Sequence, residues 1–200
     1  MRCAEGAVLS NRVKKAMHEL ILGGAKSGKS RAAEARAARW LATPGHEGLL
    51  IATAQAGDAE MAARIARHRA DRAARVPRLG CVEIGAGLAE VIAAQAAPQR
   101  LLVVDCLTLW LTQLAMPLQG PPANDAALRA ATDGLLQALR AASGPVVWVS
   151  NEIGLGVLPL GAQTRRFVDA LGLLHQALAA CCARVTLMVA GHELALKGAA

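Results

Sequence analysis

The stretch with the strongest structural signal is Gly23-Gly24-Ala25-Lys26-Ser27-Gly28-Lys29-Ser30, which matches the phosphate-binding loop pattern G-x-x-x-x-G-K-[S/T] at every fixed position. The residues Glu19-Leu20-Ile21-Leu22 before it predict a short buried strand, and the Ala-rich run from Ser30 to Trp40 predicts a helix. A strand, a glycine loop and a helix in this order form the structural context that the motif requires. The alternative is a Gly/Ser turn ahead of an unrelated helix. We interpret the stretch as a nucleoside triphosphate site, because its backbone N–H groups and the helix N-terminus favour phosphate.

Two side chains of the loop and one carboxylate further along have specific expected roles. Lys29 would reach the β- and γ-phosphates, and the Ser30 hydroxyl would bind Mg²⁺. Asp105 directly follows Leu101-Leu102-Val103-Val104, a continuous apolar run that predicts a strand covered on both faces. Enzymes with this loop hold their Mg²⁺ with a carboxylate at such a strand end, where ligands of open α/β sheets collect. The alternative is that Asp105 caps a helix beginning near Leu107.

Strands and helices are expected to alternate along the whole chain. Apolar runs predict further strands at 48–53, 81–84, 145–150 and 184–190, and the segments between them predict helices at 58–75, 88–96, 125–142 and 165–183. This alternation predicts an α/β fold of the P-loop NTPase type, a mostly parallel sheet with helices on both faces. Residues 1–18 lack apolar periodicity, so we expect a disordered or extended tail before a single domain at 19–200.

The composition of the chain indicates what kind of molecule the protein is expected to bind. The formal charge is +7, with 54% apolar and 18% charged residues, which favours a compact globular enzyme over a disordered chain. The basic residues are scattered, and four aromatic residues are too few for a base-stacking platform, so we expect anionic small molecules rather than nucleic acid. No apolar stretch has the length of a membrane span, and the N-terminus lacks a signal-peptide pattern, so we expect a cytoplasmic protein.

One histidine lies in an unusually basic segment. His68 is surrounded in the sequence by Arg64, Arg67, Arg69 and Arg72. These cations would stabilise phosphate and would favour the neutral imidazole, which is the form that attacks phosphorus. The alternative is a surface histidine on an exposed helix. The residues alone leave both interpretations open.

A glycine-rich segment follows the strand expected at 145–150. It begins Ser150-Asn151-Glu152-Ile153-Gly154, and Arg165-Arg166 open the next expected helix. Its polar residues would lie at the same ligand-binding edge of the sheet, where they could contact a substrate or a phosphate. The alternative is a plain turn followed by solvated basic residues.

These segments together resemble one enzyme family. The similarity rests on the phosphate loop, on Ala52-Thr53-Ala54, on the run from Asp58 to Arg72 that contains Arg64-Ile65-Ala66-Arg67-His68-Arg69, and on Ser150-Asn151-Glu152-Ile153-Gly154. The chain resembles the bifunctional adenosylcobinamide kinase / adenosylcobinamide-phosphate guanylyltransferase of cobalamin synthesis from about Glu19 to Lys197. Ala54 stands where family members usually have Ser, and about three residues are inserted before Glu83.

The resemblance implies a two-step enzyme. It would phosphorylate adenosylcobinamide with ATP or GTP, and then transfer GMP from GTP through a guanylylated histidine to give adenosylcobinamide-GDP. The implied catalytic residues are His68 and Lys29, and the implied metal ligands are Ser30 and Asp105, with Mg²⁺ as cofactor. A homo-oligomer, with a trimer as the expected state, is also implied. The implied nucleotide contacts are Gly23, Gly24, Ala25, Lys26, Ser27, Gly28, Lys29, Ser30, Ala52, Thr53, Ala54, Arg69, Ala70, Asp71, Arg72, Glu83 and Asp105.

Two other functions compete with this one. Another small-molecule kinase with the same loop would lack the nucleotidyl-transfer step and would leave His68 without a chemical purpose. A nucleotide-gated binding module, such as an ATP-dependent nucleic-acid binder, would instead be stimulated by DNA or RNA.

Overall fold

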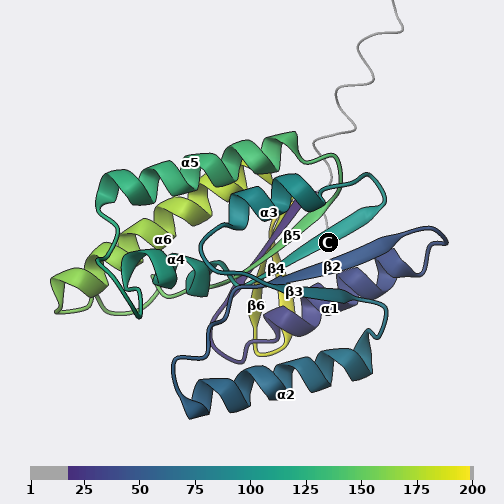
Figure 1. The fold of residues 1–200 in the computed structure, drawn as a ribbon, viewed down its shortest axis with the longest axis horizontal. Coiled ribbons are helices and arrows are strands. Elements are labelled where there is room, and N and C mark those ends of the chain that lie inside the picture. The colour runs from purple at the N-terminus through teal and green to yellow at the C-terminus, as the bar shows by residue number, and fades with distance from the viewer. Residues whose placement is uncertain (1–17, 199–200) are drawn as a thin grey trace, which may run out of the picture.

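The computed structural model describes residues 18–198 and has a seven-stranded sheet at its centre (Figure 1). The strand order is β3-β2-β4-β5-β1-β6-β7. The strands are β1 (His18–Gly23), β2 (Glu47–Ala52), β3 (Gly80–Glu83), β4 (Arg100–Asp105), β5 (Val146–Asn151), β6 (Arg184–Val189) and β7 (His192–Lys197). The helices are α1 (Lys29–Leu41), α2 (Ala59–Arg75), α3 (Leu88–Gln95), α4 (Leu107–Ala115), α5 (Asp125–Ala141) and α6 (Ala162–Cys181). The expected α/β fold with a mostly parallel sheet is confirmed.

The strand pairings determine which residues meet at the ligand-binding edge. Strands β1 to β6 are parallel, and β7 returns antiparallel to β6. The carboxyl ends of the six parallel strands therefore lie at one edge of the sheet. The strand β1, which enters the phosphate loop, lies between β5 and β6, and β5 separates it from β4. Gly23 pairs with Asn151, and Asp105 pairs with Ala52 and Val149.

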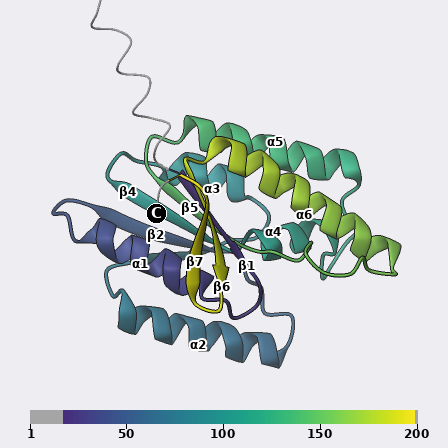
Figure 2. The same ribbon diagram turned by 180° about the vertical axis from the view of Figure 1, so that it is seen from behind.

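Helices cover both faces of the sheet, as Figures 1 and 2 show. The helix α1 packs on one face, where Ala33 and Ala37 join Ile21 and Val147 in a buried cluster. The helices α3, α4, α5 and α6 cover the other face around Trp110 and Trp148, which are nearly inaccessible to solvent. The small side chains of α1 let this helix lie close to the strands, which brings the phosphate loop down onto the sheet edge.

The helix α2 stands apart from both layers. It runs alongside α1 in Figures 1 and 2, and it has no buried residue over its whole length. Asp58 caps its N-terminus by accepting a hydrogen bond from the Met61 N–H at 2.7 Å. At its other end, the Arg75 guanidinium donates to the Glu34 carboxylate of α1 at 2.6 Å and 3.2 Å. Charged contacts rather than buried apolar surface therefore hold this helix in place.

The structure differs from the sequence-based expectation at both ends of the domain. The strand β1 begins at His18, which is buried. His18 therefore belongs to the domain and not to the tail that was expected at residues 1–18. The rest of that tail, residues 1–17, lies outside the described residues. The strand β7 was not expected, because its six residues are all exposed and lack the continuous apolar pattern of the central strands. Gly191, with φ of 84°, permits the tight turn from β6 into β7.

An ion triad with two buried members, Arg36 and Glu19, links β1, α1 and β7. Arg36 donates to the Glu19 carboxylate at 3.0 Å and 3.2 Å and to the Glu193 carboxylate at 2.6 Å through two nitrogens. Thr186 adds a third hydrogen bond to Glu19 at 3.0 Å. Arg36 and Glu19 are each less than a tenth exposed, so the triad replaces the water that both charges lost on folding.

We expect Arg36→Leu to lower the free energy of unfolding by about 3–5 kcal/mol, because it leaves the Glu19 carboxylate buried without a positively charged partner. Urea denaturation followed by circular dichroism measures this loss. The matched control is Arg100→Leu, which removes the more exposed ion pair with Glu47 and should cost about 1 kcal/mol or less. Equal losses in the two variants would contradict the structural role assigned to the triad.

Candidate nucleotide and metal site

The phosphate loop leaves β1 at Gly23 and enters α1 at Lys29. Gly23 and Gly28 have φ values of 154° and 102°, which disfavour other residues. A Cβ atom on Gly23 would also lie 2.5 Å from the Met188 carbonyl oxygen. Gly28 occupies the N-cap position of α1 and has no side chain to satisfy the N–H groups of the first turn. These N–H groups are available to an anion at the positive end of the helix dipole.

Lys29 points back into its own loop. Its Nζ donates to the Gly24 carbonyl oxygen at 2.6 Å and lies 3.5 Å from Ser27 Oγ, and the side chain is 7% exposed. Burial lowers the pKa of Lys29, and the positive charge of Arg64 acts in the same direction, whereas the Cys106 thiol and the Asp105 carboxylate oppose the change. Gly24, Ala25 and Lys26 are exposed around this lysine. The loop therefore surrounds a buried positive charge with residues whose backbone is accessible to solvent.

Asp105 ends β4, and Ser30 follows the loop that leaves β1. The two residues come together although β5 lies between β4 and β1 in the sheet. The Asp105 carboxylate accepts a hydrogen bond from Ser30. Burial raises the pKa of Asp105, while the hydrogen bond from Ser30 and the charges of His68 and Lys29 oppose that rise. The N-cap of α4 is Cys106, so the alternative role of Asp105 as the cap of that helix does not hold.

The pair of Ser30 and Asp105 fits a magnesium ion by the chemistry of its donors. A hydroxyl and a carboxylate within hydrogen-bonding reach of each other are hard oxygen ligands, and Mg²⁺ takes one or two such ligands together with phosphate oxygens and water. These two residues are the ones that would hold it.

Thr53 has a structural position at this edge. The side chain is fully buried, and its Oγ1 donates to the Cys106 carbonyl at 2.7 Å and accepts from the Cys106 N–H at 2.8 Å. The Thr53 N–H donates to the Asp105 carbonyl at 3.1 Å. Thr53 therefore fixes the end of β4, and its hydroxyl is already occupied. Its neighbours Ala52 and Ala54 are half-buried at the carboxyl end of β2.

The helix α2 presents His68 and Arg64 toward the phosphate loop. The two residues are four positions apart, so they share a face of the helix. The charge of Arg64 lowers the pKa of Lys29, and the charge of His68 lowers that of Asp105, which places both near the loop. His68 is exposed. The helix is therefore exposed, as one of the two interpretations expected, and the role of His68 toward phosphate stays a prediction.

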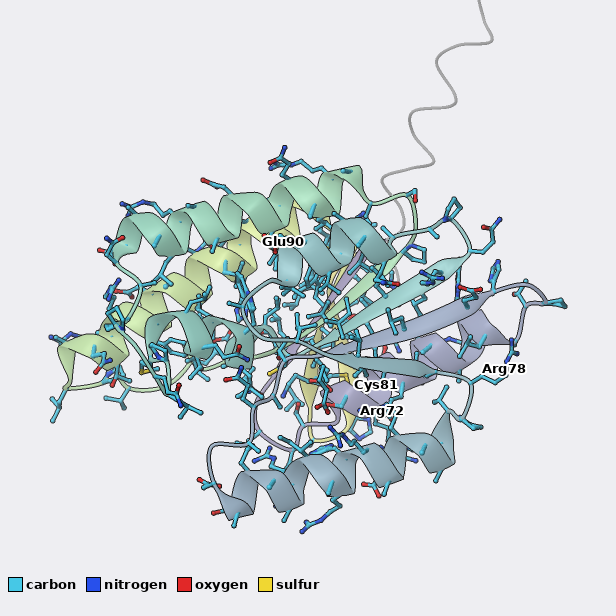
Figure 3. All side chains as sticks on the ribbon, in the orientation of Figure 1. Arg72, Arg78, Cys81 and Glu90 are labelled. Carbon is cyan, nitrogen blue, oxygen red and sulfur yellow. The ribbon has the colours of Figure 1, made fainter. Side chains whose placement is uncertain are left out.

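Three other arginines of this helix are engaged with the protein. Arg69 pairs with Glu83 at the end of β3, and Arg72 lies 3.2 Å from the Cys81 sulfur. Figure 3 shows the labelled Arg72 and Cys81 side by side between α2 and β3. With Arg75 bound to Glu34, three of the basic side chains connect α2 to the domain. The sequence had treated the arginines near His68 as equivalent phosphate ligands, and the structure separates them into two groups.

Two adjoining grooves lie between α2 and the sheet edge. One has a volume of about 450 Å³ and includes Ala54, Ile65, Arg69, Glu83 and Ile84 in its lining. The other has a volume of about 350 Å³ and continues past Arg69 and Glu83 to Arg72 and Cys81. The structure thus brings four of the nine expected nucleotide contacts outside the loop into these grooves, namely Ala54, Arg69, Arg72 and Glu83. Ala70 and Asp71 are exposed on α2 and line neither groove.

The glycine-rich segment after β5 also lies against the phosphate loop. The Glu152 N–H donates to the Gly23 carbonyl oxygen at 3.0 Å. Sequence reasoning missed His175, which reaches this segment from the middle of α6. A single histidine in an apolar helix carries no motif, so no signal in the sequence could identify it.

A phosphate loop on β1, a carboxylate at the end of β4 and helices on both faces of a parallel sheet define a P-loop nucleotide-binding protein. Residues 19–196 match the model of the cobinamide kinase / cobinamide phosphate guanyltransferase family, and the chain belongs to this family.

Curated relatives agree with this assignment. The chain is 50% identical to the bifunctional adenosylcobalamin biosynthesis protein CobP of Pseudomonas aeruginosa over 182 residues, which cover 91% of this chain and 98% of the relative. It is 38% identical to the bifunctional adenosylcobalamin biosynthesis protein CobU of Salmonella typhimurium and 36% identical to that of Escherichia coli. Each of these two alignments covers 89% of this chain and 98% of the relative. In the part of the chain that the structure describes, no helix has the length and apolar content needed to span a membrane.

Proposed function

We propose that this enzyme phosphorylates adenosylcobinamide with ATP or GTP, and then transfers GMP from GTP to the phosphorylated product by way of His68. The observation that carries this proposal is the position of α2, which ion pairs of Arg69 with Glu83 and of Arg75 with Glu34 hold beside β3 and α1. From this position the charges of Arg64 and His68 act on Lys29 and Asp105. Separating adenosylcobinamide phosphate from adenosylcobinamide-GDP by chromatography tests both steps with one substrate.

The kinase step needs positioning and charge stabilisation more than covalent chemistry by the protein. In the proposed arrangement the loop N–H groups bind the phosphates, and Lys29 exchanges the Gly24 carbonyl for oxygens of the β- and γ-phosphates. Ser30 and Asp105 would hold Mg²⁺, which would neutralise charge on the bound phosphates. Thr53 supports this site from behind, because it fixes the strand end that carries Asp105.

The guanylyl step uses a covalent intermediate. The exposed imidazole of His68 attacks the α-phosphorus of GTP, a P–N bond forms, and pyrophosphate leaves. The phosphate of adenosylcobinamide phosphate then attacks the same phosphorus, and the P–N bond breaks to release His68. Splitting one displacement into two easier ones is the usual advantage of such an intermediate. The cation of Arg64 on the same helix face would stabilise the negative charge of the nucleotide.

The groove beside α2 fits the guanine base. Glu83 offers a carboxylate, which can accept hydrogen bonds from both the ring N–H and the exocyclic amino group of guanine. In the structure Arg69 pairs with this carboxylate, so the base would have to share or replace that pairing. Adenine presents an acceptor in place of the ring N–H, so the same carboxylate disfavours it.

We expect Glu83→Gln to raise the KM for GTP in the guanylyl step by roughly tenfold to a hundredfold, because it removes a charged acceptor worth about 1.5–3 kcal/mol. Release of pyrophosphate from GTP measures this effect. The control is Glu90→Gln, an exposed glutamate of the neighbouring helix α3 that lines neither groove, and it should leave the KM unchanged. An unchanged KM in Glu83→Gln would remove this residue from the guanine site.

We also propose that the enzyme is a homo-oligomer, with a trimer as the expected state. Support comes from apolar side chains that the single chain leaves exposed, including Leu194 and Leu196 on the outer strand β7 and Leu173 on α6. Light scattering of the purified protein measures the mass of the assembly directly.

A further inference from the structure

A chain of hydrogen bonds connects β5, α4 and α6 at the ligand-binding edge. The Asn151 N–H donates to Thr108 Oγ1 at 2.8 Å, and this oxygen lies 3.1 Å from Ser150 Oγ. Ser150 Oγ lies 2.7 Å from His175 Nε2, and His175 Nδ1 faces the Glu152 carboxylate at 3.8 Å. Thr108, Ser150 and His175 are all buried, whereas the Glu152 side chain is 21% exposed. The chain of contacts therefore leads from the core to an accessible carboxylate.

The hydrogen bonds of this network have one favourable direction of donation. If Thr108 donates to Ser150 and Ser150 donates to His175 Nε2, the imidazole proton is on Nδ1 and points toward Glu152. In the opposite direction a lone pair on Nδ1 would face the negative carboxylate, which is repulsive. Burial lowers the pKa of His175 against the opposing charge of Glu152, so the imidazole is neutral at neutral pH. The network thus sets the tautomer of His175.

The carboxylate of Glu152 differs in its partners from the carboxylates of Glu83 and Asp105, which also lie at this edge of the sheet. Among residues 18–198, Glu83 pairs with Arg69 and Asp105 accepts a hydrogen bond from Ser30, whereas Glu152 contacts no lysine or arginine. One Glu152 oxygen accepts the Gly154 N–H at 2.6 Å and the other faces His175. Each carboxylate oxygen can accept a further hydrogen bond, and the side chain is open to solvent on one side. A substrate hydroxyl could therefore bind there.

Glu152 is also placed beside the group that would be transferred. Its N–H binds the Gly23 carbonyl at the start of the phosphate loop, so backbone contact fixes the residue next to the loop. On its other side the chain continues into the exposed apolar residues Leu155, Val157 and Leu158, a surface suited to a large substrate with an apolar body. Glu152 thus lies between the proposed phosphate site and accessible apolar surface.

We propose that Glu152 is the general base of the kinase step and that Ser150 and His175 are positioning residues that orient its carboxylate. The inference rests on the proposed function. The alcohol oxygen of adenosylcobinamide forms a bond to the γ-phosphorus, the bond from that phosphorus to the β-bridging oxygen breaks, and the nucleoside diphosphate leaves with the electron pair. The hydroxyl proton passes to Glu152 and then to solvent. The guanylyl step has no alcohol to deprotonate and does not require this carboxylate.

The test compares the two half-reactions in the same preparation of each variant. Kinase kcat and KM are measured with adenosylcobinamide and ATP, and self-guanylylation of His68 is measured with labelled GTP alone. We expect Glu152→Gln to lower kinase kcat by about a hundredfold, within the range for a general base. Ser150→Ala and His175→Gln should each lower it by roughly fivefold to tenfold, and the double variant by no more than the larger single effect. All variants should keep the KM for ATP and the guanylylation rate within about twofold.

The matched control is His46→Gln, which changes a histidine stacked on Trp40 ahead of β2, at the opposite edge of the sheet. It should leave both half-reactions at the wild-type level. A kinase kcat within about threefold of wild type in Glu152→Gln would overturn the proposal, and so would equal loss of both half-reactions in Ser150→Ala and His175→Gln. If the wild-type enzyme forms no adenosylcobinamide phosphate, the proposed function itself fails, which is a different result from an active Glu152→Gln variant.

Discussion

Replacing Lys29 with alanine is expected to lower kcat for phosphorylation of adenosylcobinamide by at least about 10²- to 10³-fold, the effect of losing a major stabiliser of transition-state charge. The Lys29 ammonium is buried 2.6 Å from the Gly24 carbonyl, inside the loop that would hold the γ-phosphate. The other lysine of the loop, Lys26, is exposed, so we do not expect it to replace this buried charge. Initial rates of formation of adenosylcobinamide phosphate measure the effect.

The control for this variant is Lys197→Ala, which makes the same change at the end of β7, next to the amino end of β6. It should retain full activity. A Lys29→Ala enzyme within about threefold of wild type would show that the loop does not bind the transferred phosphate, because that loss is too small for a catalytic cation.

Replacing His68 with alanine is expected to abolish formation of adenosylcobinamide-GDP while adenosylcobinamide phosphate still accumulates. Only the second reaction needs a nucleophile on the protein, and the phosphate loop and Asp105 are unchanged in this variant. His68 is exposed on a helix without buried residues, so its removal should not affect folding. Chromatographic separation of the two products measures both effects in one assay.

His46→Ala serves as the matched histidine control and should make both products at the wild-type rate. Formation of the GDP product by His68→Ala at a rate near wild type would exclude His68 as the nucleophile. Guanylyl transfer would then proceed through another nucleophile or by direct attack of the phosphorylated substrate on GTP.

The parts of the fold that could be predicted were those with strong local signals. The phosphate loop requires glycine at positions of unusual φ, and the central strands need continuous apolar runs because helices cover both faces. The strand β7 lacked such a run because it lies at the exposed edge, so the same reasoning missed it. The position of β5 between β1 and β4 also depends on packing between distant segments.

The candidate site was predictable where a residue belonged to a motif and was less so where its role depends on a partner. Asp105 and Ser30 were expected as a pair, and the structure joins them by a hydrogen bond. The arginines near His68 looked alike in sequence, yet Glu83 and Glu34, which are distant along the chain, engage Arg69 and Arg75. His175 gains its place at the edge only when α6 packs on β5, so its contact with Ser150 was not foreseeable.

The central claim is that one phosphate loop serves both a kinase and a histidine-dependent nucleotidyltransferase, and covalent labelling tests it most directly. The enzyme is incubated with GTP labelled at the α-phosphorus, denatured, and separated by electrophoresis. We predict label on the wild-type protein that is labile in acid and stable in alkali, as a histidine phosphoramidate is, and no label on His68→Ala. Absence of label on the wild-type protein, or equal label on His68→Ala, would contradict this account.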